Sequence, residues 1–226
     1  MKILSVIRAE SVRALRTVGG DLGYLPTAGA ALSAQYGFQG LPTAAEISGA
    51  EPNKGITFRR GKLDLEDRAP IAIDYFQIFP SGVTVCTHTD TKDSDLVLDH
   101  ILKWASVQFK LEYEFIRPGI AHSSQLEIRL EKSLPDLFPL LAPVGAAITE
   151  SLDEWWEIKP SYELININFW FDKTKYSAFM PQIFRLDRRD GIQFEQNVYY
   201  AEASLTTEKH IEVLSLLESV CLKALE

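Results

Sequence analysis

Apolar and polar residues alternate most regularly along residues 71–79. Apolar side chains occupy every second position there, and polar residues such as Asp74 fall between them, as in a strand with one buried face. The triplet 80–82, Pro-Ser-Gly, predicts a tight turn, because proline fixes φ and glycine accepts positive φ. The β-branched run 83–87 follows. We therefore predict a β-hairpin.

A polar stretch, 87–95, separates this hairpin from a second apolar pattern. It is rich in Thr and Asp, whose side chains accept hydrogen bonds from the free amides of a helix start, and we expect Asp93 or Ser94 to be the N-cap. From Leu98 to Ala105, apolar residues recur at helical spacing. The pattern predicts a helix that packs on the hairpin.

The remaining patterns predict further strands and two more helices. The expected helices are 137–152, interrupted at Pro143, and a C-terminal helix beginning at Thr206 or Thr207. The expected strands are 56–63, 109–115, 124–130, 162–171, 183–186 and 192–200, with a turn at Arg117-Pro118-Gly119.

Two segments of the chain, 56–107 and 162–224, share one order of elements. Each contains strand, strand, turn, strand, a threonine-rich cap and a helix, and 108–161 joins them. We predict an internal duplication of a βββα unit, although such units are common enough to recur by chance. The expected fold is α+β, with antiparallel strands in one sheet or two and the helices on one side.

The first 55 residues have a different composition. Residues 19–40 contain six glycines, so we expect an irregular N-terminal arm over 1–55, followed by an α+β domain over 56–226. Within the arm, 2–18 fits either a short strand followed by a helical turn or one helix throughout. The aromatic side chains of 19–40 favour docking on the domain or on a partner.

Composition indicates a globular chain with an acidic surface. Hydrophobic residues make up 46% of the 226 residues, the formal charge is −8 and the pI is about 5.1. An acidic balance makes nucleic-acid binding unlikely, because that binding depends on basic surface. The longest apolar stretch, 137–148, contains two prolines and is too short to cross a bilayer, so we expect no membrane partner.

The cysteines and the start of the chain suggest a cytoplasmic protein. Lys2 and Arg8 interrupt the first residues before the apolar region of a secretory signal can form. Cys86 and Cys221 lie in a predicted strand and on the apolar side of a predicted helix, which indicates buried free thiols. Neither has the basic, accessible setting of a nucleophile.

Common catalytic signatures are missing. The chain has no phosphate-binding loop, dinucleotide fingerprint, zinc-protease motif, nucleophile elbow or Cys-x-x-Cys pair. We therefore expect no cofactor and favour a non-enzymatic role.

An acidic constellation lies before the first predicted helix. Carboxylates gathered in this way can bind a divalent cation, and Asp90, Asp93 and Asp95 are weak metal candidates, with His88, Asp99 and His100 nearby. The EF-hand pattern does not fit. Helix capping is the favoured interpretation.

An arginine-bearing loop and strand form the best candidate binding surface. Guanidinium groups suit phosphate or carboxylate ligands, although a salt-bridged network on a solvated sheet face is the favoured interpretation. The candidate binding residues are Arg185, Arg188, Arg189, Glu195, Asn197, Tyr199 and His210.

Aromatic residues are concentrated in the C-terminal half. Such clusters form ligand pockets or association hot spots, but more often they belong to the core, as we expect for Trp156 and Trp170. The group comprises Trp155, Trp156, Trp170, Tyr176, Phe179, Tyr199 and Tyr200.

These observations favour a non-enzymatic cytoplasmic interaction or assembly protein. It would bind a protein partner or form a homo-oligomer through the glycine-rich arm and an aromatic or arginine-bearing sheet face. The alternative is an enzyme or ligand-binding domain for a small anionic compound, a phosphate or carboxylate.

Overall fold

The computed structural model describes residues 1–19, 25–47, 55–152, 160–172, 174 and 181–223. The chain forms two compact units. The α3 unit, named for helix α3 (Thr91–Phe109), comprises Val6–Ser124 and Ser204–Thr207. The α6 unit, named for helix α6 (Thr207–Lys223), comprises Met1–Ser5, Gln125–Ala203 and Glu208–Glu226.

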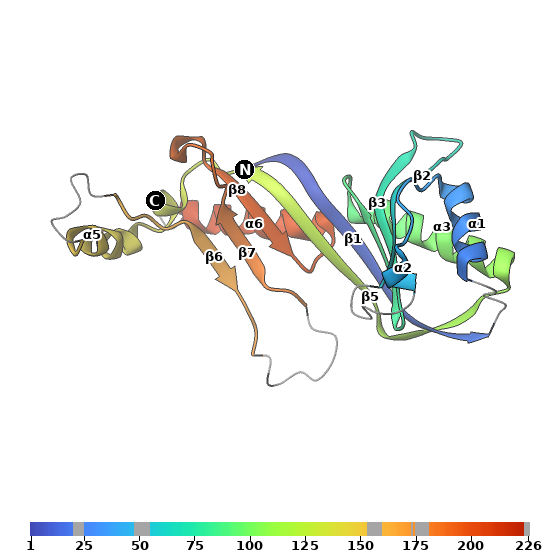
Figure 1. The fold of residues 1–226 in the computed structure, drawn as a ribbon. Helices are drawn as coiled ribbons and strands as arrows, with labels where there is room; N and C mark the ends of the chain where they lie inside the picture. Colours follow the sequence, from blue (N-terminus) through green and yellow to red (C-terminus); the bar gives the residue numbers. More distant parts are fainter. Residues whose placement is uncertain (20–24, 48–54, 153–159, 173, 175–180, 224–226) are drawn as a thin grey trace. The chain divides into compact units, whose positions relative to one another are not determined.

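The chain combines helices with runs of antiparallel strands, which confirms the predicted α+β class (Figure 1). The elements before α3 are β1 (Lys2–Gly19), α1 (Leu25–Tyr36), α2 (Ala44–Ile47), β2 (Ile56–Leu63), β3 (Ile71–Phe79) and β4 (Gly82–Thr87). After α3 come β5 (Glu112–Arg129), α4 (Leu134–Leu137), the 3-10 turn η1 (Pro139–Leu141), α5 (Ala142–Glu150), β6 (Asn166–Phe169), β7 (Phe184–Arg188), the 3-10 turn η3 (Phe194–Gln196), β8 (Val198–Ala203) and α6.

The α3 unit contains one continuous hydrophobic core. Its strands are hydrogen-bonded in the order β2-β3-β4-β1-β5, and helices α1 and α3 contribute apolar side chains to the same cluster. Tyr36 of α1, Phe58 of β2 and Leu98 of α3 are almost completely buried in it. Burying apolar surface is the main driving force of folding, so these contacts join both helices to the sheet.

The predicted hairpin is confirmed as β3 and β4. Val83 pairs with Ile78, and Gly82 pairs with Phe79. A side chain at Gly82 would collide with the carbonyl oxygen of Arg13, so glycine allows β1 to pair with this end of β4. The N-cap of α3 is Asp90, not the predicted Asp93 or Ser94, because the Asp90 carboxylate accepts a hydrogen bond from the Asp93 amide at 2.8 Å.

The α6 unit contains the strand order β5-β8-β7-β6. Leu126 of β5, Leu186 of β7 and Leu214 of α6 are fully buried. Strand β6 pairs with β7 through Asn166 and Asp187 at one end. The helical segment near Pro143 restarts as predicted, with η1 before the proline and α5 containing it near its first turn.

The N-terminal segment is not an irregular arm. Residues 2–19 form strand β1, which pairs with β4, and 25–36 form helix α1. In this helix, Leu32 is buried in the α3-unit core, and Gly29 lies against the ring of Phe58. The glycines suggested a loop, but packing against the sheet outweighs their low intrinsic helix propensity.

Two further strand predictions are corrected. Strand β5 runs through the expected turn at 117–119, with Gly119 at φ 79° inside it. The strand expected over 162–171 is limited to Asn166–Phe169. Its neighbour Trp170 is 55% exposed, so the prediction that it belongs to the core is wrong.

The order strand, strand, strand, helix occurs twice, as β2-β3-β4-α3 and β6-β7-β8-α6. Each set follows an 18-residue strand, β1 or β5, which the predicted segments 56–107 and 162–224 leave out. Thr91 and Thr207, which begin the two helices, are 116 residues apart. The same spacing relates the bounds of β4 to those of β8. Origin by duplication stays a prediction.

Both cysteines are buried free thiols, as predicted. Burial raises the pKa of the Cys86 thiol to about 12, which keeps it protonated at neutral pH. Within the described part of the chain, the helices are either too short or too polar to span a membrane.

Candidate functional site

Arg185 of the predicted anion site is held by an ionic network on one face of the sheet. Its guanidinium lies 2.9 Å from Glu202 and 3.4 Å from Asp187, and it stacks over the ring of Tyr200 at 5.0 Å. Strand β7 places Arg185 and Asp187 on the same face, opposite Glu202 and Tyr200 of β8. Two carboxylates already neutralise this guanidinium.

Arg188 and Tyr199 lie on the other face of the same strand pair. The Tyr199 hydroxyl accepts hydrogen bonds from Arg188 and from the Leu134 amide, each at 3.0 Å. The guanidinium of Arg188 also covers the ring of Phe194. Because Tyr199 is fully buried, these contacts fix η3 and the start of α4 on the sheet, which is a structural role.

The other predicted anion-site residues are dispersed. Arg189 pairs with Glu127 at 3.3 Å, and Glu195 lies in the exposed turn η3. Asn197 ends that turn with φ 52°, and its carbonyl accepts a hydrogen bond from the Leu130 amide. His210 is fully buried, edge-on to Phe184. Since Arg185 and Arg188 face opposite sides, the seven residues do not line one pocket.

The acidic constellation at the start of α3 is also divided among separate partners. Asp90 caps the helix, and Asp93 pairs with Arg68 at 2.8 Å. His88 contacts the carbonyl of Ile7 at 2.6 Å. Among the residues that the structure describes, no three His, Cys, Asp or Glu side chains gather closely enough to hold a metal ion.

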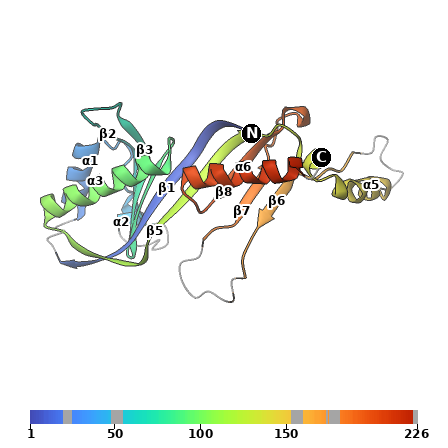
Figure 2. The ribbon, with the colours of Figure 1, turned by 180° about the vertical axis from the view of Figure 1, so that it is seen from behind.

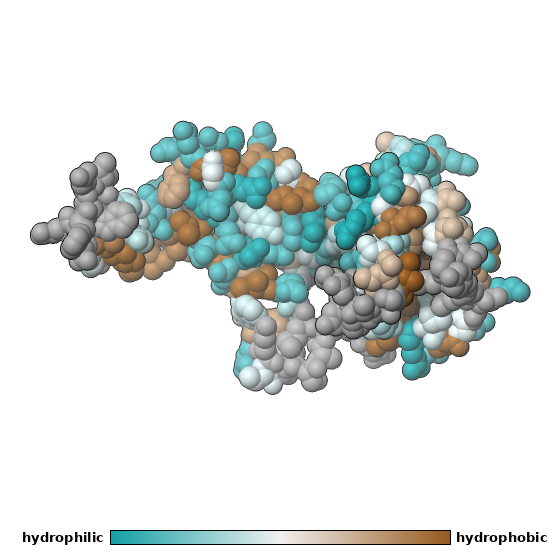
Figure 3. Space-filling model, in the orientation of Figure 1, coloured by the Kyte–Doolittle hydropathy of each residue, from teal (hydrophilic) through white to brown (hydrophobic). Residues whose placement is uncertain are grey.

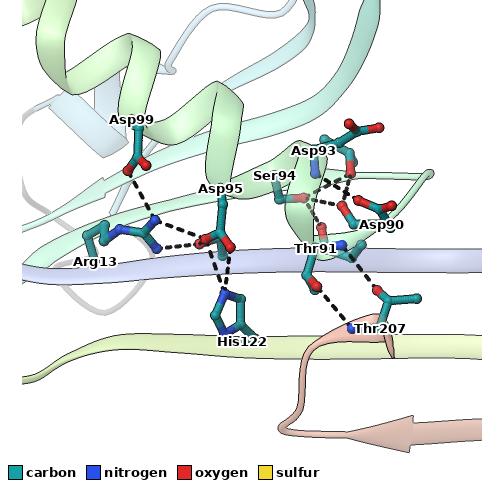
Figure 4. A network of polar contacts seen from close by, with 12 residues as sticks. Arg13, Asp90, Thr91, Asp93, Ser94, Asp95, Asp99, His122 and Thr207 are labelled. Carbon is teal, nitrogen blue, oxygen red and sulfur yellow. Dashed lines mark hydrogen bonds and ion pairs between the residues drawn. The ribbon is translucent and has the colours of Figure 1, made fainter. Parts of the chain in front are cut away.

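Asp95 belongs to a polar network that the sequence did not predict (Figure 4). Its carboxylate accepts hydrogen bonds from His122 Nε2 at 3.0 and 3.1 Å and from the hydroxyl of Ser11. Arg13, almost completely buried on β1, contacts Asp95 at 2.9 Å and Asp99 at 3.0 Å. The network joins α3 to β1 and β5.

The chemistry of this network is electrostatic and structural. Although burial raises the pKa of Asp95, hydrogen bonds from His122, Ser11 and Arg13 lower it to about 2. A serine nucleophile needs a histidine base beside its hydroxyl, whereas here the carboxylate lies between Ser11 and His122. The sequence signal was weak, because the strand containing Ser11 and Arg13 had no clear periodicity.

The first residues of α3 and α6 bind each other (Figure 4). The Thr91 amide donates to Thr207 Oγ1 at 3.1 Å, and the Thr207 amide donates to Thr91 Oγ1 at 2.9 Å. Both residues are buried. Each side chain therefore satisfies a helix-start amide of the other element.

An apolar cavity of about 140 Å³ lies in the α3 unit. Leu32, Phe58, Ile101 and Trp104 are among the residues that line it. Ligand sites usually add convergent polar groups that orient the ligand, and the lining here is almost entirely apolar. We interpret the cavity as a gap in the core.

The α6 unit has a larger, open hollow of about 520 Å³ beside α5. Val144 and Ile148 of α5 line it together with Leu141 and Tyr162, and all four side chains are exposed. Leu140, in the preceding turn, is 91% exposed. Figure 3 shows brown, hydrophobic atoms over this helix.

Helix α5 differs from an ordinary surface helix because none of its residues is buried. A globular helix normally buries an apolar stripe. An apolar helix without a buried face, beside an open hollow, has the features by which interaction surfaces are recognised. We call Leu140, Leu141, Val144, Ile148 and Tyr162 the α5 surface, and it is the candidate functional site.

The described members of the predicted aromatic group do not form one cluster. Tyr199 is buried, whereas Trp170 is exposed. Trp155, Trp156, Tyr176 and Phe179 lie outside the described residues.

Comparisons with known proteins give no match: no family model, curated protein or solved structure is detectably similar to this chain.

Proposed function

We propose that this chain is a non-enzymatic interaction or assembly protein that associates with a protein, or with further copies of itself, through the α5 surface. The observation that carries the proposal is that α5 buries none of its residues although most of them are apolar. Covering such side chains with a partner removes apolar area from water, which favours association by about 25 cal/mol per Å² before the costs of binding.

The place of docking differs from the one expected from the sequence. Leu32, Tyr36 and Phe38, in the expected docking segment 19–40, are buried in the core of the α3 unit. Deleting 19–40 would remove core residues and unfold the unit, so it is no test of binding. The α5 surface can be changed without removing a buried side chain.

The test substitutes the α5 surface and measures assembly. We expect Val144→Glu combined with Ile148→Glu to weaken association at least tenfold, about the effect of losing an interface hot spot. The measurements are the native mass of the purified protein over a range of concentrations and the stoichiometric proteins that copurify with it from its native cells.

Ala147→Glu is the matched control, because Ala147 is exposed on the same helix but does not line the hollow. It should leave the native mass and the copurifying proteins unchanged. The proposal would be refuted if the parent protein is monomeric and copurifies with no stoichiometric partner, and the double variant gives the same result. A cytoplasmic location stays a prediction.

The alternative role, binding a small phosphate or carboxylate compound, has less support. Arg185 is already paired with two carboxylates, and Arg188 is engaged by Tyr199 and Phe194. An anion at either arginine would have to displace these contacts.

A further inference from the structure

Helices α1 and α5 contain matching sequences at matching places. Gly29–Leu32 reads Gly-Ala-Ala-Leu, and Gly145–Ile148 reads Gly-Ala-Ala-Ile. Their spacing of 116 residues is the one that separates Thr91 from Thr207. Each helix lies between the 18-residue strand of its half and the three strands that follow. Helix α5 is therefore the counterpart of α1.

Helix α1 uses this sequence to cover the α3 unit. A Cβ at Gly29 would lie 3.5 Å from the Phe58 ring, so the helix approaches the sheet closely. Two turns further on, the Tyr36 hydroxyl lies 2.9 Å from His100 Nδ1, and the Tyr36 ring centroid lies 5.7 Å from that of Trp104. His100 and Trp104 thus mark where α1 contacts α3.

The equivalent face of α6 is apolar, and no residue that the structure describes covers it. At the same spacing, His100 corresponds to Leu216 and Trp104 to Val220, which are 61% and 56% exposed. Val213, the counterpart of the fully buried Val97, is also exposed. We call Val213, Leu216 and Val220 the α6 stripe. It has the composition of a covered helix face.

Helix α5 of the same chain packs against the backbone at Tyr162. The Tyr162 amide donates a hydrogen bond to Thr149 Oγ1 at 3.0 Å, and Gly145 lies against the Tyr162 backbone. In Figures 1 and 2, α5 lies beyond the C-terminal end of α6 and does not run along the helix. The described part of one molecule therefore presents both an exposed helix and an exposed helix face.

We propose that α5 of one copy covers the α6 stripe of a second copy, in the way that α1 covers α3 within one chain. The exchange is reciprocal, so both copies bury α5 and the stripe, and the contact closes as a dimer. This inference rests on the proposed function and identifies the partner as a second copy of this chain.

Cross-linking between two different variants tests the pairing. Tyr36 contacts His100, and the corresponding residues at the 116-residue spacing are Leu152 and Leu216. Chains carrying Leu152→Cys and chains carrying Leu216→Cys are mixed and treated with a short bismaleimide. We expect a covalent dimer containing one chain of each kind. Protein without either substitution should give no product, because Cys86 and Cys221 are buried.

Ser215→Cys is the matched control, because Ser215 is exposed on the same helix but lies outside the stripe. Mixed with Leu152→Cys chains, it should give several-fold less product. Equal yields from the two mixtures would overturn the proposal. So would cross-links found only within a chain that carries both Leu152→Cys and Leu216→Cys, because α5 would then cover its own α6.

A second measurement separates this inference from the proposed function. We expect Leu216→Glu to abolish the dimer in native mass measurements and Ser215→Glu to preserve it. If Leu216→Glu has no effect but the α5 double variant still loses its partner, α5 binds another protein, and only the inference fails. If neither surface affects association, both proposals fail.

Discussion

Helices α1 and α5 share a closely similar short sequence but have opposite surroundings. Leu32 of α1 is buried with Phe58 and Ile101, whereas Ile148 of α5 is exposed beside an open hollow. The contacts of the flanking chain account for the difference. After α1, Gly40 pairs with Arg59 of β2, and this bridge holds the segment against the sheet. Helix α5 is instead bound by the hydrogen bond from the Tyr162 amide to Thr149 Oγ1. Similar sequences can therefore close a core in one unit and leave a surface in the other.

The largest expected effect comes from a substitution that exposes the face of α3 covered by α1. Replacing Tyr36 with Ala removes a buried ring from the contact with His100 and Trp104. It should lower the free energy of unfolding by about 3–5 kcal/mol, as for other buried aromatic residues. Urea unfolding measures this change. Tyr162→Ala is the control, because Tyr162 is 46% exposed, and an equal loss there would contradict the difference between the units.

Substitutions at the equivalent positions Trp104 and Val220 compare the two helices directly. Trp104→Ala should cost about 2 kcal/mol, below the range for fully buried aromatics because Trp104 is only partly buried. Val220→Ala should change the stability of dilute, monomeric protein by less than about 0.5 kcal/mol. Unfolding followed at two protein concentrations checks both values. A larger loss for Val220→Ala at the higher concentration only would show that the stripe is covered by association.

The Asp95 network distinguishes α3 from α6, whose counterpart of Asp95 is Ile211. Asp95→Asn should lower the free energy of unfolding at neutral pH by about 2 kcal/mol, less than for a fully buried pair because 31% of the side chain is exposed. Folding depresses the pKa of Asp95 from 3.8 to about 2, so its stabilisation is complete above the unfolded-state value and lost as the pH falls through about 2.

Unfolding midpoints measured from pH 6 to about pH 2 test this assignment. The parent protein should lose stability more steeply than Asp95→Asn below about pH 4. If the two proteins lost stability in parallel as the pH falls, Asp95 would not be the group that makes stability depend on acid pH. Asp64→Asn is the control, because Asp64 pairs with Lys62 on an exposed surface.

The smallest expected effect concerns the reciprocal caps of α3 and α6. Thr207→Ala removes the acceptor of the Thr91 amide, which should cost about 1 kcal/mol. Thr207→Ser keeps the hydroxyl and should recover most of that loss. Thr91→Ala should cost a similar amount, since Thr91 Oγ1 accepts from the Thr207 amide. Urea unfolding of the three variants would contradict this pairing if Thr207→Ser were as unstable as Thr207→Ala.

The sequence alone determined the elements with local signals. The alternating residues 71–79 and the Pro-Ser-Gly turn predicted the hairpin, and the apolar spacing from Leu98 to Ala105 predicted helix α3, although its N-cap is Asp90. The recurring order of strands and helix was also readable, because turn residues and caps are local features. The buried cysteines followed from their places in these elements.

Only the tertiary structure decided which polar and apolar residues meet. Asp95 lies in the sequence beside other helix-start acids, but its partners Arg13 and His122 come from distant strands. Arg185 and Arg188 are close in sequence, yet strand alternation places them on opposite faces. The glycines of 19–40 suggested a loop, whereas Gly29 lies within helix α1 and faces the ring of Phe58. The exposure of α5 was equally unreadable, because burial depends on neighbours that are far away along the chain.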